Sequence, residues 1–541
     1  AVAFTRFYRQ SLLTYKIIIM GNQKLSTKAL HAGHDTSLTQ GTRAVPLYQS
    51  TSYVFNNADH AANLFALAEP GYIYTRLNNP TNDVLEQRLA SLEGGIGAVV
   101  TAGGTAAIST TLLTLLRSGD HIVASNSLYG GTYNLLNVTL PRLGITTTFV
   151  DPSNPENFAD AVQENTRVFF AESLGNPKLD VLDLSEISKR AKASKVPFIV
   201  DNTVATPALL RPIEHGADIV IHSLTKFING NGTALGGVII DAGKFDWSNG
   251  KFPEFTEPSA GYHGLIYHDV LAEASFIAKV RIEGLRDLGA ALSPFNAFQI
   301  LQGLETLDVR MKRHSENALK LAQWLESRDE VTWVNYPGLE SSKYKKLSDK
   351  YLPNGQSGIV TFGVKGGYDS AKTVADKTEI FSLLANIGDS KSLIIHPAST
   401  THQQLNDAEK KSSGVSDDLI RVSVGLENID VSKKVYVVEG PLDSCFVDNC
   451  LAMAGSDGQM PYDDVVMVYD NEPRSIEIVK KIEKAIGRHY SIVIWPEGIQ
   501  SKDINDMIMS GMSKADIKLI IEQNTYKDLQ ATMALSKWRK C

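Results

Sequence analysis

The sequence predicts an α/β protein in which a mostly parallel sheet is wrapped by helices and followed by a smaller α+β domain and an α/β tail. Three observations predict this class. Apolar runs alternate with stretches of helical periodicity, two of these runs deliver a carboxylate and an amine, and the composition changes after about residue 430. The runs that we interpret as strands of the sheet lie at 97–100, 120–124, 167–170, 196–200 and 219–221.

The order of the predicted elements suggests the domain boundaries. A chain of 541 residues is too long for a single core, so two to four domains are expected. We expect a large domain with an amino-terminal arm at 24–285. A smaller α+β domain at 286–432 follows, with a long helical stretch and then strand-like runs near Val331 and Ile359. The tail occupies 433–541.

The composition changes abruptly at the start of this tail. All three cysteines and seven of the nine methionines lie beyond residue 430. No linker rich in proline, glycine or serine marks the change, whereas natural domain fusions usually have an exposed linker. We interpret the chain as two unrelated pieces joined abruptly, and both a working fusion and a join introduced by gene prediction or assembly are open.

The overall composition excludes several classes of protein. A formal net charge of -7 gives no indication of a polyanionic partner. No apolar run approaches the roughly 18 residues that a membrane span needs, so no membrane partner is expected. Three cysteines are too few for a disulfide framework, which favours the reducing cytoplasm.

Residues 1–23 stand apart from the predicted domains. The first 19 residues carry basic side chains and no acidic one, which is typical of a transit-like presequence, but they lack a proper apolar core with a cleavage site. A translated upstream stretch before a start at Met20 explains them equally well.

Asp201 and Lys226 are the most informative pair. Asp201 ends the apolar run 196–200, and the run 219–221 leads to Lys226. In open α/β sheets ligands bind at the carboxyl ends of the strands, so both side chains are expected at a binding edge. Pyridoxal phosphate uses a lysine to form a Schiff base and a carboxylate to keep the pyridinium nitrogen protonated. Unrelated residues in an ordinary α/β enzyme give the same pattern, so the flanking motifs must decide.

A phosphate site is predicted beside this pair. The segment 101–105 follows a strand and opens an apolar helix, and its Gly104 and Thr105 lie where helix amides face a phosphate. A glycine pair at a strand-to-helix turn is often only a turn. Ser223 and Thr225 add hydroxyl donors, although helix capping is an alternative role for them.

Other candidates have aromatic, amide or guanidinium side chains. Tyr129 follows a strand and can stack on a flat heteroaromatic ring, and Asn176 can donate to a phenolate oxygen. Arg76, close to Tyr74, suits a phosphate, and Arg421 suits a substrate carboxylate, because the planar guanidinium donates two parallel hydrogen bonds. Core packing, a plain turn and surface salt bridges are the competing roles.

Over roughly residues 25–430 the chain resembles the cystathionine γ-synthase family of Cys/Met-metabolism pyridoxal phosphate enzymes. The resemblance rests on the segments 74–81, 200–203 and 222–226. The segments 261–264, 286–290, 303–306 and 388–397 resemble the O-acetylhomoserine sulfhydrylase branch.

This resemblance implies a type I aminotransferase-like fold and a homotetramer built from active dimers. Lys226 becomes the Schiff-base lysine, Asp201 the partner of the pyridinium nitrogen and Tyr129 the stacking ring. Tyr74 and Arg76 reach the phosphate of the neighbouring subunit. The other implied cofactor contacts are Gly104, Thr105, Asn176, Thr203, Ser223 and Thr225, and the implied substrate contacts are Ser392 and Arg421.

The implied reaction is a γ-replacement. O-acetyl-L-homoserine loses acetate and gains sulfide or methanethiol, giving homocysteine or methionine, with Lys226 shuttling protons. A cystathionine γ-synthase or γ-lyase on the same fold is the alternative within this class.

The tail carries acidic residues at the ends of two predicted strands. Glu439 ends the run 435–438, and Asp470 and Glu472 follow the run 465–469. Carboxylates at neighbouring strand ends suit Mg²⁺ and phosphoryl chemistry, but acidic turns after strands look the same.

The tail resembles the toprim domain of tailed-phage DNA primases. The resemblance implies that Glu439 is a catalytic acid/base and that Asp470 and Glu472 bind Mg²⁺; Glu472 replaces the usual second aspartate. The rival hypotheses are therefore a nucleic-acid enzyme that acts through this tail and an inactive chimera. The zinc-binding and basic amino-terminal parts of such primases are absent from the sequence.

Overall fold

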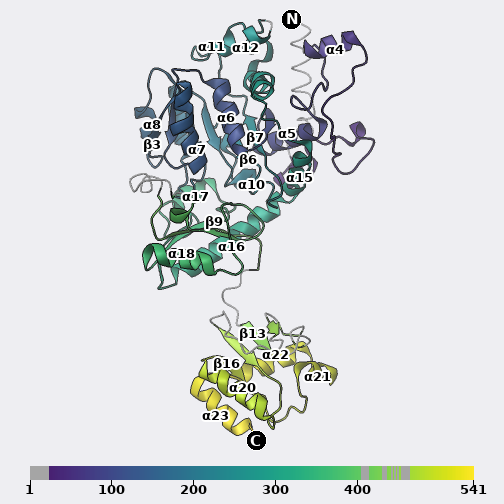
Figure 1. The fold of residues 1–541 in the computed structure, drawn as a ribbon, viewed down its shortest axis with the longest axis vertical. Coiled ribbons are helices and arrows are strands. Elements are labelled where there is room, and N and C mark those ends of the chain that lie inside the picture. Colours follow the sequence, from purple (N-terminus) through teal and green to yellow (C-terminus); the bar gives the residue numbers. More distant parts are fainter. Residues whose placement is uncertain are drawn as a thin grey trace. The chain divides into compact units, whose positions relative to one another are not determined.

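The computed structural model describes residues 23–66, 68–262, 264–401, 403, 414–428, 435–439, 443, 446–447, 450–452 and 464–541. Residues 1–22 of the predicted presequence and the segment at the predicted 432/433 boundary lie outside these residues. The chain divides into two compact units, 1–429 and 430–541, which are described separately (Figure 1). No described helix is both long and apolar enough to cross a membrane.

The large sheet of the first unit has seven strands in the order β1-β7-β6-β5-β4-β2-β3. Its strands are β1 (Gly97–Thr101), β2 (His121–Ser125), β3 (Thr146–Val150), β4 (Thr166–Glu172), β5 (Phe198–Asp201), β6 (Ile219–Ser223) and β7 (Gly237–Asp241). Every neighbouring pair is parallel except the two pairs made by β7, which runs opposite to both β1 and β6. The predicted mostly parallel sheet is confirmed.

Helices cover both faces of this sheet (Figure 1). The α-helices before the smaller sheet are α3 (Leu25–His31), α4 (Ala58–Phe65), α5 (Pro80–Glu93), α6 (Gly104–Leu115), α7 (Gly130–Asn134), α8 (Glu156–Asp160), α9 (Leu184–Ala193), α10 (Thr206–Leu209), α11 (Pro253–Thr256), α12 (Tyr267–Leu271), α13 (Ser275–Lys279), α14 (Arg286–Leu288), α15 (Pro294–Glu305) and α16 (Leu307–Glu326). Short 3-10 or π segments are η1 (Thr36–Leu38), η2 (Leu135–Thr139), η3 (Leu140–Leu143), η4 (Pro212–His215), η5 (Ala260–Tyr262), η6 (Ala272–Ala274) and η7 (Val280–Leu285).

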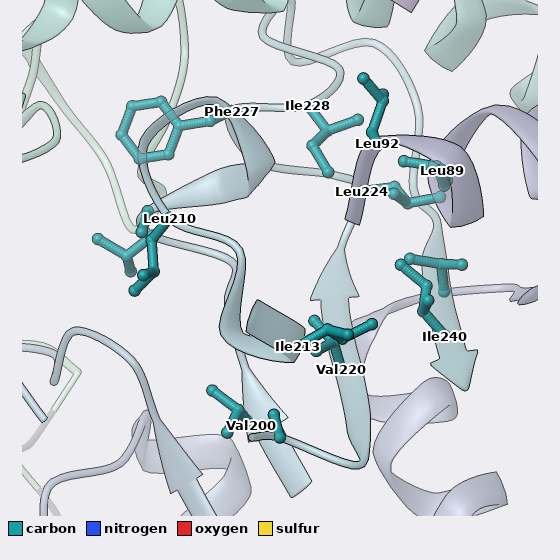
Figure 2. Packing of buried hydrophobic residues seen from close by; sticks show 14 of the residues in the cluster. Leu89, Leu92, Val200, Leu210, Ile213, Val220, Leu224, Phe227, Ile228 and Ile240 are labelled. Atoms are coloured by element: carbon teal, nitrogen blue, oxygen red, sulfur yellow. The ribbon is translucent and has the colours of Figure 1, made fainter. Parts of the chain in front are cut away.

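Successive strand residues feed two different cores, because side chains alternate between the faces of a sheet. In β5, Phe198 and Val200 pack into one buried cluster and Ile199 into the other. Figure 2 shows the first cluster around the segment after β6, where Leu224, Phe227 and Ile228 are all buried. The residues on both sides of Lys226 are thus anchored in the core.

The smaller sheet has five strands in the order β10-β11-β12-β9-β8, and only the β10/β11 pair is parallel. Its elements are β8 (Val331–Asn335), α17 (Lys345–Tyr351), β9 (Ile359–Val364), α18 (Gly367–Lys377), β10 (Ser382–Leu383), β11 (Leu393–Ile395), η8 (Pro397–Ser399) and β12 (Leu419–Ser423). Helix α16 joins the two cores: Met311 packs in the core of the large sheet, and Ala318 and Ala322 pack in the core of the smaller one.

The second unit is a five-stranded sheet in the order β14-β13-β15-β16-β17, parallel except for the β16/β17 pair. Its elements are β13 (Val435–Val438), β14 (Cys450–Ala452), β15 (Val465–Val468), α20 (Ile476–Gly487), β16 (Ser491–Val493), α21 (Ile504–Met509), α22 (Lys514–Gln523), β17 (Thr525–Tyr526) and α23 (Asp528–Trp538). Buried clusters lie on both faces of the sheet, so this unit has a core of its own.

Candidate active site

Asp201 and Lys226 lie at the carboxyl ends of two neighbouring parallel strands. β5 ends at Asp201, which is opposite Ile221 of β6, and Lys226 follows the end of β6. Asp201 Oδ1 accepts hydrogen bonds from the amide and the hydroxyl of Thr203, at 3.0 and 2.6 Å. The Thr203 hydroxyl also accepts a hydrogen bond from the Ser223 amide at 2.8 Å. Thr203 therefore ties the carboxylate to the segment that carries the lysine.

Burial raises the pKa of the Asp201 carboxyl, while the Thr203 hydrogen bonds and the neighbouring His222 act in the opposite direction. A cationic ring nitrogen beside this carboxyl would reverse the shift, because an opposite charge stabilises the ionised form. The site therefore suits a partner that brings a positive charge.

The Lys226 amine has an amide partner and no carboxylate partner among the described residues. Its Nζ donates to Asn386 Oδ1 at 2.5 Å. Burial, together with the charge of Arg421, lowers the pKa of Lys226 to about 8. A far larger share of this amine is thus neutral, and so nucleophilic, near pH 7 than for an ordinary lysine.

Arg421 lies on β12 and faces the same group. Its Nη1 donates to Asn176 Oδ1 at 3.2 Å, and its Nη2 donates to the carbonyl of Asn386 at 3.3 Å. Burial lowers its pKa to about 10, and no salt bridge to a carboxylate is found for it among the described residues. A buried guanidinium of this kind is a ready site for an incoming carboxylate.

Tyr129 is held at this edge by a buried carboxyl group. Its amide donates to Glu172 Oε1 at 2.6 Å, and the residue is 53% exposed. Glu172 lies opposite Asp201 on the neighbouring strand. Burial, with the nearby Asp201, raises the pKa of Glu172 well above its ordinary value. An exposed ring on a fixed backbone is free to cover a flat ligand.

The start of α6 offers an uncapped set of amides. The residue before the helix is Gly103, and no side chain caps its first turn. A Cβ on Gly104 would lie 2.6 Å from the Ser223 Cβ, so only glycine permits this approach. Thr105 is exposed next to it, whereas the Thr225 hydroxyl also bonds with Gly236. Uncapped amides, hydroxyls and a positive helix end fit a phosphate group.

Three predicted residues lie apart from this group. Arg76 stacks over the Tyr74 ring, 5.3 Å from its centroid, and both are exposed. Ser392 is buried, but its hydroxyl donates to Glu427 at 2.9 Å and accepts from the Gly425 amide at 2.8 Å. Its hydroxyl is therefore occupied within the smaller domain. Asn386, which the sequence analysis missed, stands beside Lys226 and Arg421 instead.

The acidic residues of the second unit line one cavity of about 360 Å³. Glu439 forms an ion pair with Lys481, with 2.7 Å between Oε1 and Nζ. The Nζ of Lys502 lies 3.7 Å from Asp470 Oδ2 and 3.4 Å from Glu472 Oε1. Burial and the neighbouring Glu439 raise the pKa of Asp470 to about 6. In the described part of the chain, no group of three or more His, Cys, Asp or Glu side chains is arranged to hold a metal ion.

The lysine, the strand-end carboxylate, the uncapped helix start and the exposed ring are the groups that a pyridoxal phosphate enzyme needs. The comparisons with known proteins agree and go further: the model of the Cys/Met metabolism PLP-dependent enzyme family matches residues 26–433. The chain belongs to this family.

Curated relatives and solved structures match the same part of the chain. An O-acetyl-L-homoserine sulfhydrylase from Leptospira meyeri is 57% identical over 418 residues, which cover 76% of this chain and 95% of the relative. A homocysteine synthase from Schizosaccharomyces pombe is 50% identical over 76% of this chain and 96% of its own length.

A crystal structure from Campylobacter jejuni has a TM-score of 0.73 and 45% sequence identity, covering 75% of this chain and 97% of that chain. That protein is assigned as an O-acetylhomoserine (thiol)-lyase and carries N′-pyridoxyl-lysine-5′-monophosphate.

Proposed function

We propose that the first unit catalyses γ-replacement on O-acetyl-L-homoserine, with sulfide or methanethiol as the incoming nucleophile. The products are homocysteine or methionine, and acetate. The observation that carries the proposal is the Lys226–Asn386–Arg421 group, which sets a readily neutral amine beside a buried guanidinium. Relatives that share about half or more of their residues with this chain are sulfhydrylases and homocysteine synthases by name, which supports the substrate class.

Each residue has a defined task in this proposal. Bound pyridoxal phosphate supplies an electron sink, with Asp201 at its ring nitrogen and the start of α6 at its phosphate. Arg421 binds the α-carboxylate of the substrate and so orients Cα toward Lys226. Lys226 Nζ, neutral once it is free, removes the proton from Cα, gives that proton up to the bound cofactor and, neutral again, removes one from Cβ. Acetate leaves Cγ with the bonding electrons, hydrosulfide adds to the same carbon, and the protons return to Cα and Cβ.

Product analysis tests the reaction directly. The purified protein with pyridoxal phosphate, O-acetyl-L-homoserine and sulfide is expected to release homocysteine and acetate in equal amounts, and Lys226→Ala is expected to release neither. Cystathionine formed from cysteine in preference to homocysteine from sulfide would instead assign the chain to the γ-synthase alternative. Sulfide-dependent homocysteine formation by Lys226→Ala would contradict the proposed role of the lysine.

We infer that the active form is a homotetramer of active dimers in which Tyr74 and Arg76 serve the neighbouring subunit. Both side chains are exposed and bond to none of the residues around Lys226 in the described part of the chain. Inactive Arg76→Ala and inactive Lys226→Ala chains, refolded together, are expected to recover about a quarter of the wild-type activity, because each mixed dimer has one intact site. No recovery would contradict a shared site.

We also infer a cytoplasmic location, which the low cysteine content favours.

A second candidate function concerns residues 430–541. We propose a toprim-type, Mg²⁺-dependent phosphoryl transfer, because Glu439 follows β13 and Asp470 and Glu472 follow the adjacent parallel strand β15, all lining one cavity. Mg²⁺ would have to displace Lys481 and Lys502 from these carboxylates. Mg²⁺-dependent nucleotide incorporation on single-stranded DNA that Glu439→Gln abolishes is the expected result. Incorporation that survives in Glu439→Gln would contradict it.

A further inference from the structure

Arg310 is a buried cation without a carboxylate partner among the described residues. It lies on α16 and is 6% exposed. Its guanidinium donates to the carbonyls of Phe227 (2.6 Å), Ile228 (3.1 Å) and Gly303 (2.7 Å), and its Nε donates to Thr306 Oγ1 at 3.0 Å. Burial alone lowers its pKa to about 10, with no anion acting against it. Two of the carbonyls belong to the residues directly after Lys226.

Burying the Arg310 guanidinium costs desolvation free energy, and two glycines in the surrounding backbone permit the close packing around it. Burying an unpaired cation is among the most destabilising substitutions a core can carry. Gly230, with a φ of +71°, leaves the space that the guanidinium fills, because a Cβ there would lie 2.2 Å from Arg310 Nη1. Gly303 similarly lets α15 approach Asn229, whose carbonyl would lie 2.0 Å from an added Cβ. A methionine or leucine would fill this volume at a lower desolvation cost, so packing alone does not account for the arginine.

The same face of α16 continues with two more buried polar side chains. His314 Nδ1 lies 2.7 Å from the carbonyl of Val424 and therefore carries the proton of that hydrogen bond. Asn317 donates to the carbonyls of Gly425 and Glu427, at 3.0 and 2.8 Å. These carbonyls follow β12, the strand that carries Arg421. We call Arg310, His314 and Asn317 the α16 ladder.

One end of the ladder thus holds the segment after Lys226, and the other holds the segment after Arg421. We propose that the α16 ladder, with Arg310 as its principal member, sets the position of the Lys226 amine relative to the Arg421 guanidinium. Its three residues are positioning residues, because they act through backbone carbonyls. The proposal rests on the assignment of Lys226 as the lysine that binds the cofactor, and it does not depend on the identity of the amino-acid substrate.

The spacing of the two groups has a measurable consequence in the protein without cofactor. Burial, together with the charge of Arg421, keeps the pKa of Lys226 low. If Lys226 moves away from Arg421, or gains access to water, its pKa rises toward the value of an exposed lysine. The rate at which the apoprotein captures pyridoxal phosphate depends on the neutral amine, so the midpoint of its pH profile reports this spacing.

The test uses stopped-flow capture of pyridoxal phosphate by the apoprotein across pH 6–10. Arg310→Lys keeps the charge but loses the planar fork, and Arg310→Met loses both. The midpoint is expected to rise by about one unit in each, with a roughly tenfold slower capture at pH 7. Asn317→Ala is expected to shift the midpoint in the same direction by less, and it carries the test with Arg310→Lys if Arg310→Met does not fold.

Arg88 supplies the matched control. It is also buried (1% exposed) and donates to the carbonyl of Ala32, and unlike Arg310 it has a carboxylate partner, Glu305, at 3.5 Å; among the described residues no hydrogen bond joins it to the segment after Lys226. Arg88→Lys is expected to lower thermal stability while leaving the midpoint unchanged. The proposal is overturned if the Arg310 variants keep the wild-type midpoint, or if Arg88→Lys shifts it equally. Capture by Lys226→Ala at the wild-type rate would instead overturn the assignment of the lysine.

Discussion

Lysines of the two units have surroundings that shift their pKa values in opposite directions. In the first unit, burial lowers the pKa of Lys226, whose amine donates to an amide oxygen. In the second unit, hydrogen bonds to carboxylates raise the pKa of Lys481, which meets Glu439, and of Lys502, which meets Glu472. Because the amide oxygen of Asn386 carries no charge, burial is the dominant influence on the pKa of Lys226. The difference shows that the pKa of a lysine is set by the charge of its hydrogen-bond partner as well as by its burial.

The largest expected effect comes from removing Arg421, the buried cation near Lys226. Arg421→Ala removes the cation that depresses the pKa of Lys226 and also the proposed carboxylate site. We expect kcat/KM for O-acetyl-L-homoserine to fall by about 10²–10³-fold, since a charge-assisted, bidentate interaction is lost. Steady-state kinetics measure this. An unchanged KM for the amino acid, with cofactor still bound, would show that the carboxylate binds elsewhere.

The next largest effect is expected when the amide partner of Lys226 is replaced by a carboxylate, the kind of partner that the lysines of the second unit have. Asn386→Asp gives Lys226 the kind of partner that Lys481 has, so the pKa of Lys226 is expected to rise by about one unit or more. Because the folded protein then needs a higher pH to release the proton, capture of pyridoxal phosphate at pH 7 should slow roughly tenfold and recover as the pH rises. Asn386→Ala is the matched control, because it removes the bond without adding a charge. Equal pH profiles for the Asn386→Asp variant and the wild-type protein would break the comparison.

The smallest expected effect concerns Asp470 in the second unit. Its folded pKa of about 6 lies above the ordinary value, so the folded state holds the proton more tightly than the unfolded state. Its contribution to stability is therefore complete at low pH and is lost as the pH rises through about 6. Asp470→Asn should remove this loss, worth less than about 1 kcal/mol because the group is only partly buried.

Hydrogen exchange of peptides from 465–495, in the full chain and corrected for intrinsic rates, measures this effect. Protection in Asp470→Asn is expected to exceed that of the wild type at pH 7 and to match it at pH 4. Asp506→Asn, outside the residues that line the cavity, is the control. A wild-type protection that increases from pH 4 to pH 7 relative to Asp470→Asn would contradict the sign of the shift.

The sequence was sufficient where a residue's position follows from strand order. Asp201 and Lys226 were predicted at one edge because apolar runs at 196–200 and 219–221 read as adjacent buried strands, and the structure has them as parallel neighbours. Arg421 was predicted from the chemistry of its guanidinium instead; the structure places it in β12, and its role in binding a carboxylate stays a prediction.

Residues in irregular segments were harder to assign. Ser392 and Asn386 lie six positions apart around a loop whose Gly388 has a φ of +75°, and no periodicity tells which of them turns toward Lys226. Arg310 was missed for another reason. Apart from the Thr306 hydroxyl its partners are backbone carbonyls, which every residue has, so the side-chain pattern of the sequence did not indicate its role.

The α16 ladder also limits how this protein can change in length. Its three side chains share one face only because they are spaced by whole turns or nearly so, at 3.6 residues per turn. One residue inserted between Arg310 and His314 would rotate everything beyond it by about 100° and aim His314 and Asn317 away from the carbonyls after β12. Substitutions elsewhere on α16 leave the spacing of the three side chains unchanged, whereas a change in the number of residues between them alters it. Insertions and deletions should therefore be least tolerated between Arg310 and Asn317.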